Sequence, residues 1–204
     1  MDHEFLGGNL ALDFTNTLHS HGESDPGEDL KSVADLVEWA TQAGVLRDTE
    51  IHELERIHAD QVRFRRALAL REWLYEIFSR AAKGKKPTPR ALQNFQSFYQ
   101  NAIRCAEFHP TANHYRLMWP AATHPLERIS QEIARSAADL LTSEALTRVR
   151  QCSGESCSWL FVDNSRNGMR RWCDMKACGN RAKVQRFRRK VNRAAGKSVR
   201  AGDD

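Results

Sequence analysis

Four of the five cysteines in this sequence fall within 27 residues of one another. They form two pairs, each with four intervening residues, and 15 residues separate the pairs: Cys152 and Cys157, then Cys173 and Cys178. Thiolates are soft ligands that suit zinc, and four of them complete a tetrahedral shell. The spacing therefore predicts one structural Zn²⁺ with no open position for catalysis. An iron–sulfur cluster and disulfide bonds are the alternatives for the same cysteines.

The residues around these cysteines predict a compact finger. Residues 158–162 have the composition of a strand, residues 163–168 that of a turn, and residues 169–172 can return as a second strand. A helix beginning at Asn180 would follow the last cysteine. A knuckle, a hairpin and a terminal helix together make a treble-clef-like zinc finger.

The helix expected after the last cysteine has two different faces. Val184, Phe187 and Val191 recur at helical spacing, so we expect them to pack on the hairpin, near Trp159 or Trp172. The remaining surface is strongly cationic and is suited to phosphate contact and to reading guanine edges. The candidate nucleic-acid contacts are Arg170, Arg171, Arg181, Lys183, Arg186, Arg189, Lys190 and Arg193.

The charge of the chain is unevenly distributed. Residues 145–204 carry 15 basic and 5 acidic side chains, whereas residues 1–144 carry 16 basic and 21 acidic ones. A basic end on an acidic body is typical of a nucleic-acid-binding segment attached to a separate domain. A solvated tail, or a docking site for an acidic protein, would show the same pattern.

Residues 1–147 are predicted to form a multihelical domain, which makes the fold class mainly α. Capping residues and apolar periodicity place helix starts at or near Asn9, Ser32, Asp48, Thr88 and Pro125. The third of these helices would reach Lys83 with a break near Asp60. One short β-hairpin is expected to join residues 103–108 to residues 114–119. We expect residues 148–195 to form the finger and residues 196–204 a flexible tail.

A polar cluster near the first helix is the candidate site for a small-molecule effector. Its members are Asp13, Thr15, Asn16 and Thr17, followed by His19 and His21. Ordinary capping and surface hydrogen bonding would explain the same residues. The helical domain could also make a homodimer, which would suit a palindromic operator.

Several classes of protein are disfavoured by the sequence. It has no phosphate loop, dinucleotide fingerprint or nucleophile elbow, so we do not expect an enzyme. It has neither an apolar run long enough to span a membrane nor a secretory signal. We therefore expect a cytoplasmic, nucleoid-associated protein.

Two motifs resemble known families. The Cys-Gly-Asn-Arg sequence at residues 178–181, preceded by Ser165-Arg166-Asn167 and Arg170-Arg171-Trp172, resembles the CGNR zinc finger. The earlier part is similar to the ABATE domain, through Gly7-Gly8, the residues from Ala11 to Thr17, and Ala138-Asp139-Leu140-Leu141. The resemblance covers nearly the whole chain. It implies a bacterial, stress-induced transcription regulator that binds duplex DNA, with zinc on the four cysteines.

The sequence thus predicts a zinc-dependent, DNA-binding transcription regulator. The basic helix after the Cys-Gly-Asn-Arg motif would contact DNA, and the helical domain would serve as input or dimerisation module. An RNA-binding zinc protein and a protein–protein interaction module are the alternatives.

Overall fold

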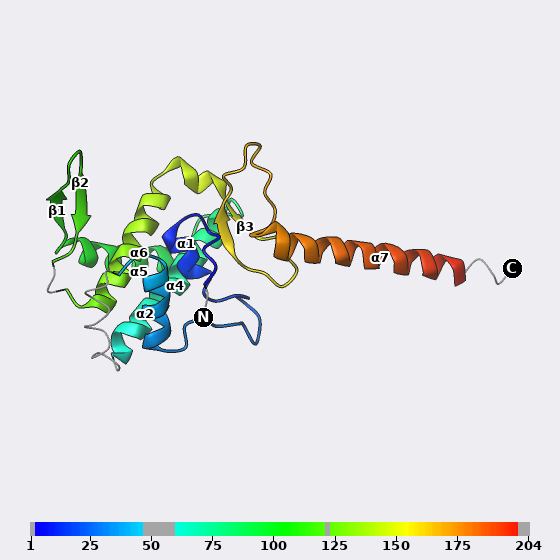
Figure 1. Ribbon diagram of the computed structural model, residues 1–204, viewed down its shortest axis with the longest axis horizontal. Helices are drawn as coiled ribbons and strands as arrows, with labels where there is room; N and C mark the ends of the chain where they lie inside the picture. The colour runs from blue at the N-terminus through cyan, green and yellow to red at the C-terminus, as the bar shows by residue number, and fades with distance from the viewer. Residues whose placement is uncertain (1–2, 47–59, 121–122, 200–204) are drawn as a thin grey trace.

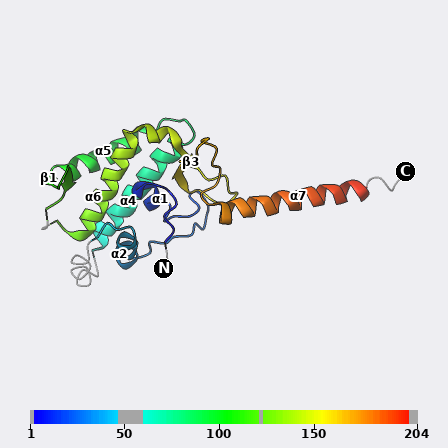
Figure 2. The same ribbon diagram turned by 45° about the horizontal axis from the view of Figure 1, so that its top comes forward.

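The computed structural model describes residues 3–46, 60–120 and 123–199, with side chains described as far as Arg189. Its described part is mainly α-helical, as predicted, with short two-stranded sheets. A helical body holds the hydrophobic core, and one long helix, α7 (Asn180–Val199), projects from one end of it (Figure 1). The turned view in Figure 2 shows the same separation, so it is not an effect of one viewing direction.

Among the residues that the structure describes, five helices build the body: α1 (Leu10–Thr15), α2 (Val33–Gln42), α4 (Gln61–Ala81), α5 (Pro89–Ile103) and α6 (Pro125–Leu141). The predicted N-caps Asn9, Ser32 and Thr88 each accept a hydrogen bond from a first-turn backbone amide. Asp60 caps α4 at the expected break, while the predicted start at Asp48 lies outside the described residues. None of the described helices is long and apolar enough to cross a membrane.

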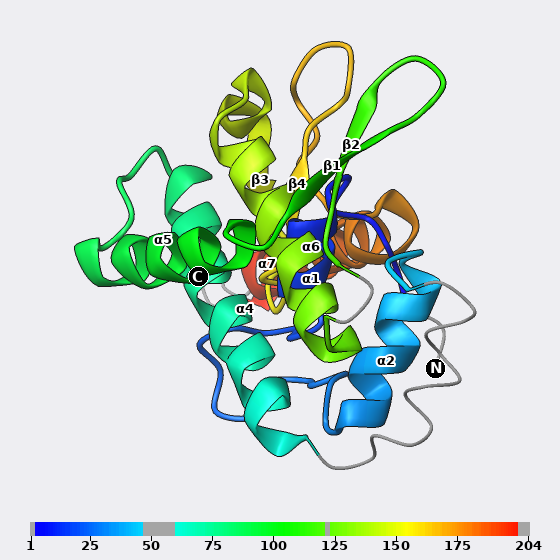
Figure 3. The same ribbon diagram turned by 90° about the vertical axis from the view of Figure 1, so that its left-hand side faces the viewer.

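Helix α1 is short but lies at the centre of the body, where it contacts α4 and α6 (Figure 3). Leu12 and Phe14 are fully buried, and the Phe14 ring lies 5.2 Å from that of Trp39 on α2. A helix of six residues is not stable by itself and depends on packing against the rest of the protein. The burial of Leu12 and Phe14 supplies that packing.

The predicted hairpin is present, with shifted bounds. Strand β1 (Glu107–Pro110) pairs antiparallel with β2 (Tyr115–Met118), and residue 103 belongs to α5. The indole N–H of Trp119 donates to the carbonyl of Ala102 at 2.7 Å, which fixes the hairpin to the end of α5.

The second hairpin packs against the helical body. After a 3₁₀ turn, η1 (Glu144–Arg148), strand β3 (Val149–Gln151) pairs antiparallel with β4 (Leu160–Val162). The side chains of Val149, Leu160 and Val162 are buried in the same core as those of α1, α4 and α6. The chain therefore enters the cysteine-rich segment from a strand anchored in the helical core.

The predicted second strand at residues 169–172 is wrong. Strand β4 pairs instead with β3, which precedes the first cysteine. The carboxylate of Asp163 accepts hydrogen bonds from the backbone amides of Ser165 and Arg170, at 2.9 and 3.0 Å. These hydrogen bonds fold the chain into a loop after β4. A second strand at residues 169–172 would instead need β-ladder hydrogen bonds to β4. Asp163 is completely buried, and it begins the segment of residues 163–168 that the sequence predicted to be a turn.

A buried asparagine joins this hairpin to α1. The side chain of Asn16 accepts from the amide of Leu160 at 2.8 Å and donates to the carbonyl of the same residue at 2.9 Å. Asn16 is 3% exposed, so water cannot replace either bond. The amide side chain thus completes the pairing of β4 on the side away from β3.

A second connection runs through the segment before α1. The amide of Val162 donates to the carbonyl of Gly7, and the amide of Gly7 donates to Oδ1 of Asp13 at 2.7 Å. A Cβ at position 7 would lie 2.9 Å from that carboxylate oxygen, so only glycine fits. Burial raises the pKa of Asp13 to about 6, against an opposing effect of the Gly7 hydrogen bond.

Replacing Asn16 tests the first connection. We expect Asn16→Ala to lower the free energy of unfolding by about 2–4 kcal/mol, because two buried backbone groups lose their partners. Urea unfolding followed by circular dichroism measures the loss. Asn113→Ala, in the exposed turn between β1 and β2, is the control and should change stability by less than about 0.5 kcal/mol. Equal, small effects of both substitutions would contradict the assigned role.

The raised pKa of Asp13 predicts a pH dependence. In the folded protein this carboxyl holds its proton to higher pH than in the unfolded chain, so its ionisation opposes folding as pH rises from about 4 to about 6. The stability of wild type relative to Asp13→Asn should therefore fall across this window, by at most about 3 kcal/mol. Urea unfolding of both proteins between pH 4 and pH 8 tests this. A difference that stays constant with pH would contradict it.

Candidate metal centre and basic helix

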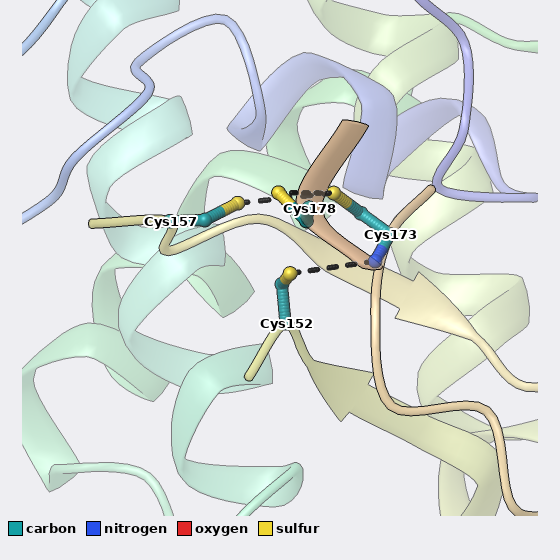
Figure 4. Close-up of side chains that lie close together, drawn as sticks. All are labelled: Cys152, Cys157, Cys173 and Cys178. Atoms are coloured by element: carbon teal, nitrogen blue, oxygen red, sulfur yellow. Dashed lines mark hydrogen bonds between the residues drawn. The ribbon is translucent and has the colours of Figure 1, made fainter. Parts of the chain in front are cut away.

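The four predicted cysteines come together in the structure, as the sequence indicated (Figure 4). Their sulfur atoms all lie within 4.8 Å of one another. The Sγ atoms of Cys157 and Cys173 are 3.8 Å apart, and those of Cys173 and Cys178 are 3.7 Å apart. Zn–S bonds of about 2.3 Å in a tetrahedron place sulfurs about 3.8 Å apart. The cluster therefore has the dimensions of one four-thiolate zinc site, and four thiolates leave no position for a substrate.

Short local elements place these ligands. Cys152 directly follows β3, and Gly154 makes the tight turn that returns the chain to Cys157. A Cβ on Gly154 would lie 3.0 Å from that of Cys157, so a larger residue here would have to displace the knuckle slightly. Cys178 lies on a π-helical turn, η2 (Met175–Gly179), that continues directly into α7.

Hydrogen bonds to sulfur and to this turn hold the ligands in position. The backbone amides of Gly154 and Cys173 both donate to Sγ of Cys152 at 3.4 Å. The carboxylate of Asp174 caps the η2 turn by accepting from the amides of Lys176 and Ala177. The base of α7 is thus fixed by the metal ligand it carries and by the cap before it.

The proximity of the thiols makes their ionisation unequal. Hydrogen bonds from the thiols of Cys157 and Cys173 lower the pKa of Cys152 to about 2. The same contacts raise the pKa of Cys157 to about 12 and that of Cys173 well above its ordinary range. Because neighbouring thiolates repel one another, all four can ionise together only around a bound cation. Zinc supplies that charge, and proton release accompanies its binding.

The predicted nucleic-acid residues fall into different environments. The guanidinium of Arg170 donates to the carbonyls of Trp172 and Cys173 and lies 4.2 Å from the centre of the Phe161 ring. Arg181 donates to Sγ of Cys178 at 3.3 Å, which offsets part of the negative charge of the thiolates. Both arginines therefore stabilise the metal centre, a role that spacing alone did not reveal.

The other predicted cations are exposed or lie further along α7. Arg171 precedes the third cysteine, and its guanidinium lies 5.3 Å from the ring centre of Trp172. Lys183, Arg186 and Arg189 are exposed on the first turns of α7. Lys190 and Arg193 are on the same helix, beyond the residues whose side chains the structure describes.

The predicted packing of the apolar face of α7 is wrong. Val184 is 50% exposed and Phe187 is 67% exposed, because the helix leaves the body instead of folding onto the hairpin (Figure 1). The rings expected to receive them are otherwise engaged. His19 packs edge-on against Trp159, with ring centres 5.4 Å apart, and Arg171 covers Trp172. The ion pair between Arg189 and Glu155, at 2.9 Å, links α7 to the knuckle. Val191 lies beyond the described side chains.

Removing one ligand tests the metal centre. We expect Cys173→Ser to lose zinc and to lose the hydrogen-exchange protection of residues 152–157 and 173–180, because three thiols cannot close the shell. Helices α4 and α6 should keep their protection, since their core is separate from the cluster. Zinc content and hydrogen-exchange mass spectrometry measure both effects. Cys105→Ser, at the exposed fifth cysteine, is the control. Full zinc content in the Cys173 variant would contradict the assignment.

Comparison with known families agrees with this geometry. Residues 8–144 match ABATE, described as "Putative stress-induced transcription regulator", and residues 148–191 match the CGNR zinc finger. Neither is described as an enzyme family. Among curated proteins, none matches the sequence. The two matched segments together account for most of the chain, and the second contains all four clustered cysteines. The chain therefore belongs to the ABATE family and carries a C-terminal CGNR zinc finger.

Proposed function

We propose that this protein is a zinc-dependent, DNA-binding transcription regulator in which α7 contacts duplex DNA. The observation that carries the proposal is the placement of α7. Its exposed cations project from the body on a helix whose first turn is anchored at the zinc site. In this proposal residues 148–195 bind DNA in the bacterial cytoplasm, at the nucleoid. Residues 1–147 sense an effector or make a dimer.

The dimensions and charge of α7 suit this role. A helix of 20 residues is about 30 Å long, and the DNA major groove is about 12 Å wide and admits an α-helix. Lys183, Arg186 and Arg189 repeat every three residues, which places them along one side of the helix. Such a row can neutralise successive phosphates, and arginine can also bind guanine in a bidentate manner.

The apolar part of α7 fits a groove-binding helix as well. Val184 and Phe187 are exposed beside the cationic row. Apolar side chains contact the methyl group of thymine in the major groove. Duplex DNA would therefore cover the side chains that the helical body leaves exposed.

A salt series tests the proposal. If about four phosphates are neutralised, the logarithm of affinity should fall with the logarithm of salt at a slope of about −3.6. Lys183→Ala with Arg186→Ala removes two contacts and should flatten the slope to about −1.8. Fluorescence anisotropy of labelled duplex DNA with the zinc-loaded chain measures both slopes.

The control is a double variant that removes two positive charges from the helical body. Lys85 and Arg90 are exposed at the start of the α5 region, and replacing both with alanine should leave the slope unchanged. Equal flattening in both double variants would indicate a nonspecific charge effect and contradict a role for α7. Stronger binding to structured RNA than to duplex DNA would favour the RNA-binding alternative. A wild-type slope shallower than about −1 on both nucleic acids would overturn the proposal and favour a protein partner.

A further inference from the structure

A cavity of about 540 Å³ lies where the helical body meets the zinc finger. One wall comes from the segment before α1, from α1 itself and from the loop after it, and includes Asp13, His19 and Asp29. The facing wall comes from the finger and includes Trp159, Cys178 and Arg181. Cys157, Cys173 and Cys178 also line the cavity, so the zinc site adjoins it. The volume is in the range of sites that hold small organic ligands, about 300–1,000 Å³.

The charged groups that line the cavity leave it negative. Four side chains contribute carboxylates: Glu4, Asp13, Asp29 and Asp174. The guanidinium of Arg181 is already paired with Sγ of Cys178. Four thiolates around Zn²⁺ add a formal charge of −2. A ligand that compensates this charge must itself be a cation.

The two histidines of the cavity are engaged by a single carboxylate. His3 and His19 lie 3.7 and 3.0 Å from Oδ2 of Asp29. In the described part of the chain, the four cysteines form the one group placed to hold a metal ion. The described residues of the cavity therefore offer no second group of this kind, and an organic cation is a ligand that its carboxylates can bind.

Asp13 is the group best placed to bind such a cation. It is 9% exposed, and its Oδ1 accepts a hydrogen bond from the amide of Gly7. Within the described residues its other oxygen, Oδ2, has no hydrogen-bond donor, although the side chain lines the cavity. Among these residues its negative charge is therefore compensated by one hydrogen bond only, and burial raises the pKa of Asp13 to about 6, so the carboxyl still ionises at neutral pH.

Two tryptophans supply the apolar part of the site. Trp39, from α2, and Trp159, from the finger, both line the cavity. Aromatic side chains attract organic cations electrostatically and also bury hydrocarbon. A buried carboxylate beside two indoles is the combination of groups that recognises an amine attached to an apolar body.

We infer that this cavity binds a small organic cation, whose ammonium, amidinium or guanidinium nitrogen donates to Oδ2 of Asp13 while its hydrocarbon part lies against Trp39 and Trp159. The inference goes beyond DNA binding and does not depend on it. The cavity wall includes Cys178 and Arg181, at the base of α7, so an occupied cavity contacts the residues that position the basic helix.

Calorimetric titration of the zinc-loaded full chain tests the inference. The probes are three organic cations, tryptamine, phenethylamine and agmatine, and the neutral analogue tryptophol. At least one cation should bind in the range below a millimolar, and tryptamine should bind at least about tenfold more tightly than tryptophol. Failure of all three cations to bind, or equal binding of tryptamine and tryptophol, would overturn the inference.

Variants locate the site. Asp13→Asn keeps an acceptor for the Gly7 amide and should weaken binding of the cation at least about tenfold. Asp25→Asn removes the same charge from an exposed aspartate that does not line the cavity, and it should bind as wild type does. Equal affinity of the Asp13 and Asp25 variants would place any binding elsewhere and overturn the inference.

A second substitution keeps the test decisive should Asp13→Asn fail to fold. Glu4 is exposed, lines the cavity and makes no hydrogen bond to another described residue. Glu4→Gln should fold as wild type does, and its affinity for the cation should be about two- to threefold lower because one negative charge is lost. An unchanged affinity in this variant would count against a cavity that selects for charge. Because these titrations contain no DNA, their outcome is separate from that of the salt series.

Discussion

The two hydrogen bonds between Asn16 and Leu160 are the interaction on which the arrangement of this protein depends. They complete the edge of β4 with a side chain from the end of α1, in a place that water does not reach. Val149, Leu160 and Val162 then pack into the core built by the helices. Cys152 follows β3 without an intervening loop, so the first zinc ligand is positioned by the helical body. The finger and the body share one framework, although two family descriptions divide the chain between them.

The zinc centre fixes the position of α7 relative to the helical body. Four clustered thiols cannot all ionise without a cation, and zinc therefore links the knuckle after β3 to the turn before α7. Arg170 and Arg181 contribute to that link through bonds to a backbone carbonyl and to a thiolate. The cavity lies along the same boundary and draws its walls from both sides of it. A ligand held there would contact both parts, including Cys178 and Arg181 at the base of α7.

Local signals in the sequence were sufficient for many features. The caps at Asn9, Ser32 and Thr88 could be predicted because they act on the turn that follows them directly. The four cysteines could be predicted because thiolates at short, repeated spacing suit one metal ion. Features that depend on distant partners could not. The partner of β4 lies on the far side of the knuckle, and periodicity marks an apolar face such as that of Phe187 without indicating what covers it. A count of charges likewise cannot separate Arg170, which braces the metal centre, from exposed Arg186.

The most direct test of the account is hydrogen exchange of the zinc-loaded chain with and without duplex DNA. The account predicts that DNA slows exchange along α7, from Asn180 onward, because contact with the groove stabilises a helix that otherwise projects into solvent. Exchange in α4, α5 and α6 should be unaffected by DNA. Protection of the body with no change in α7 would contradict the account, because the DNA-binding surface would then lie elsewhere on the molecule.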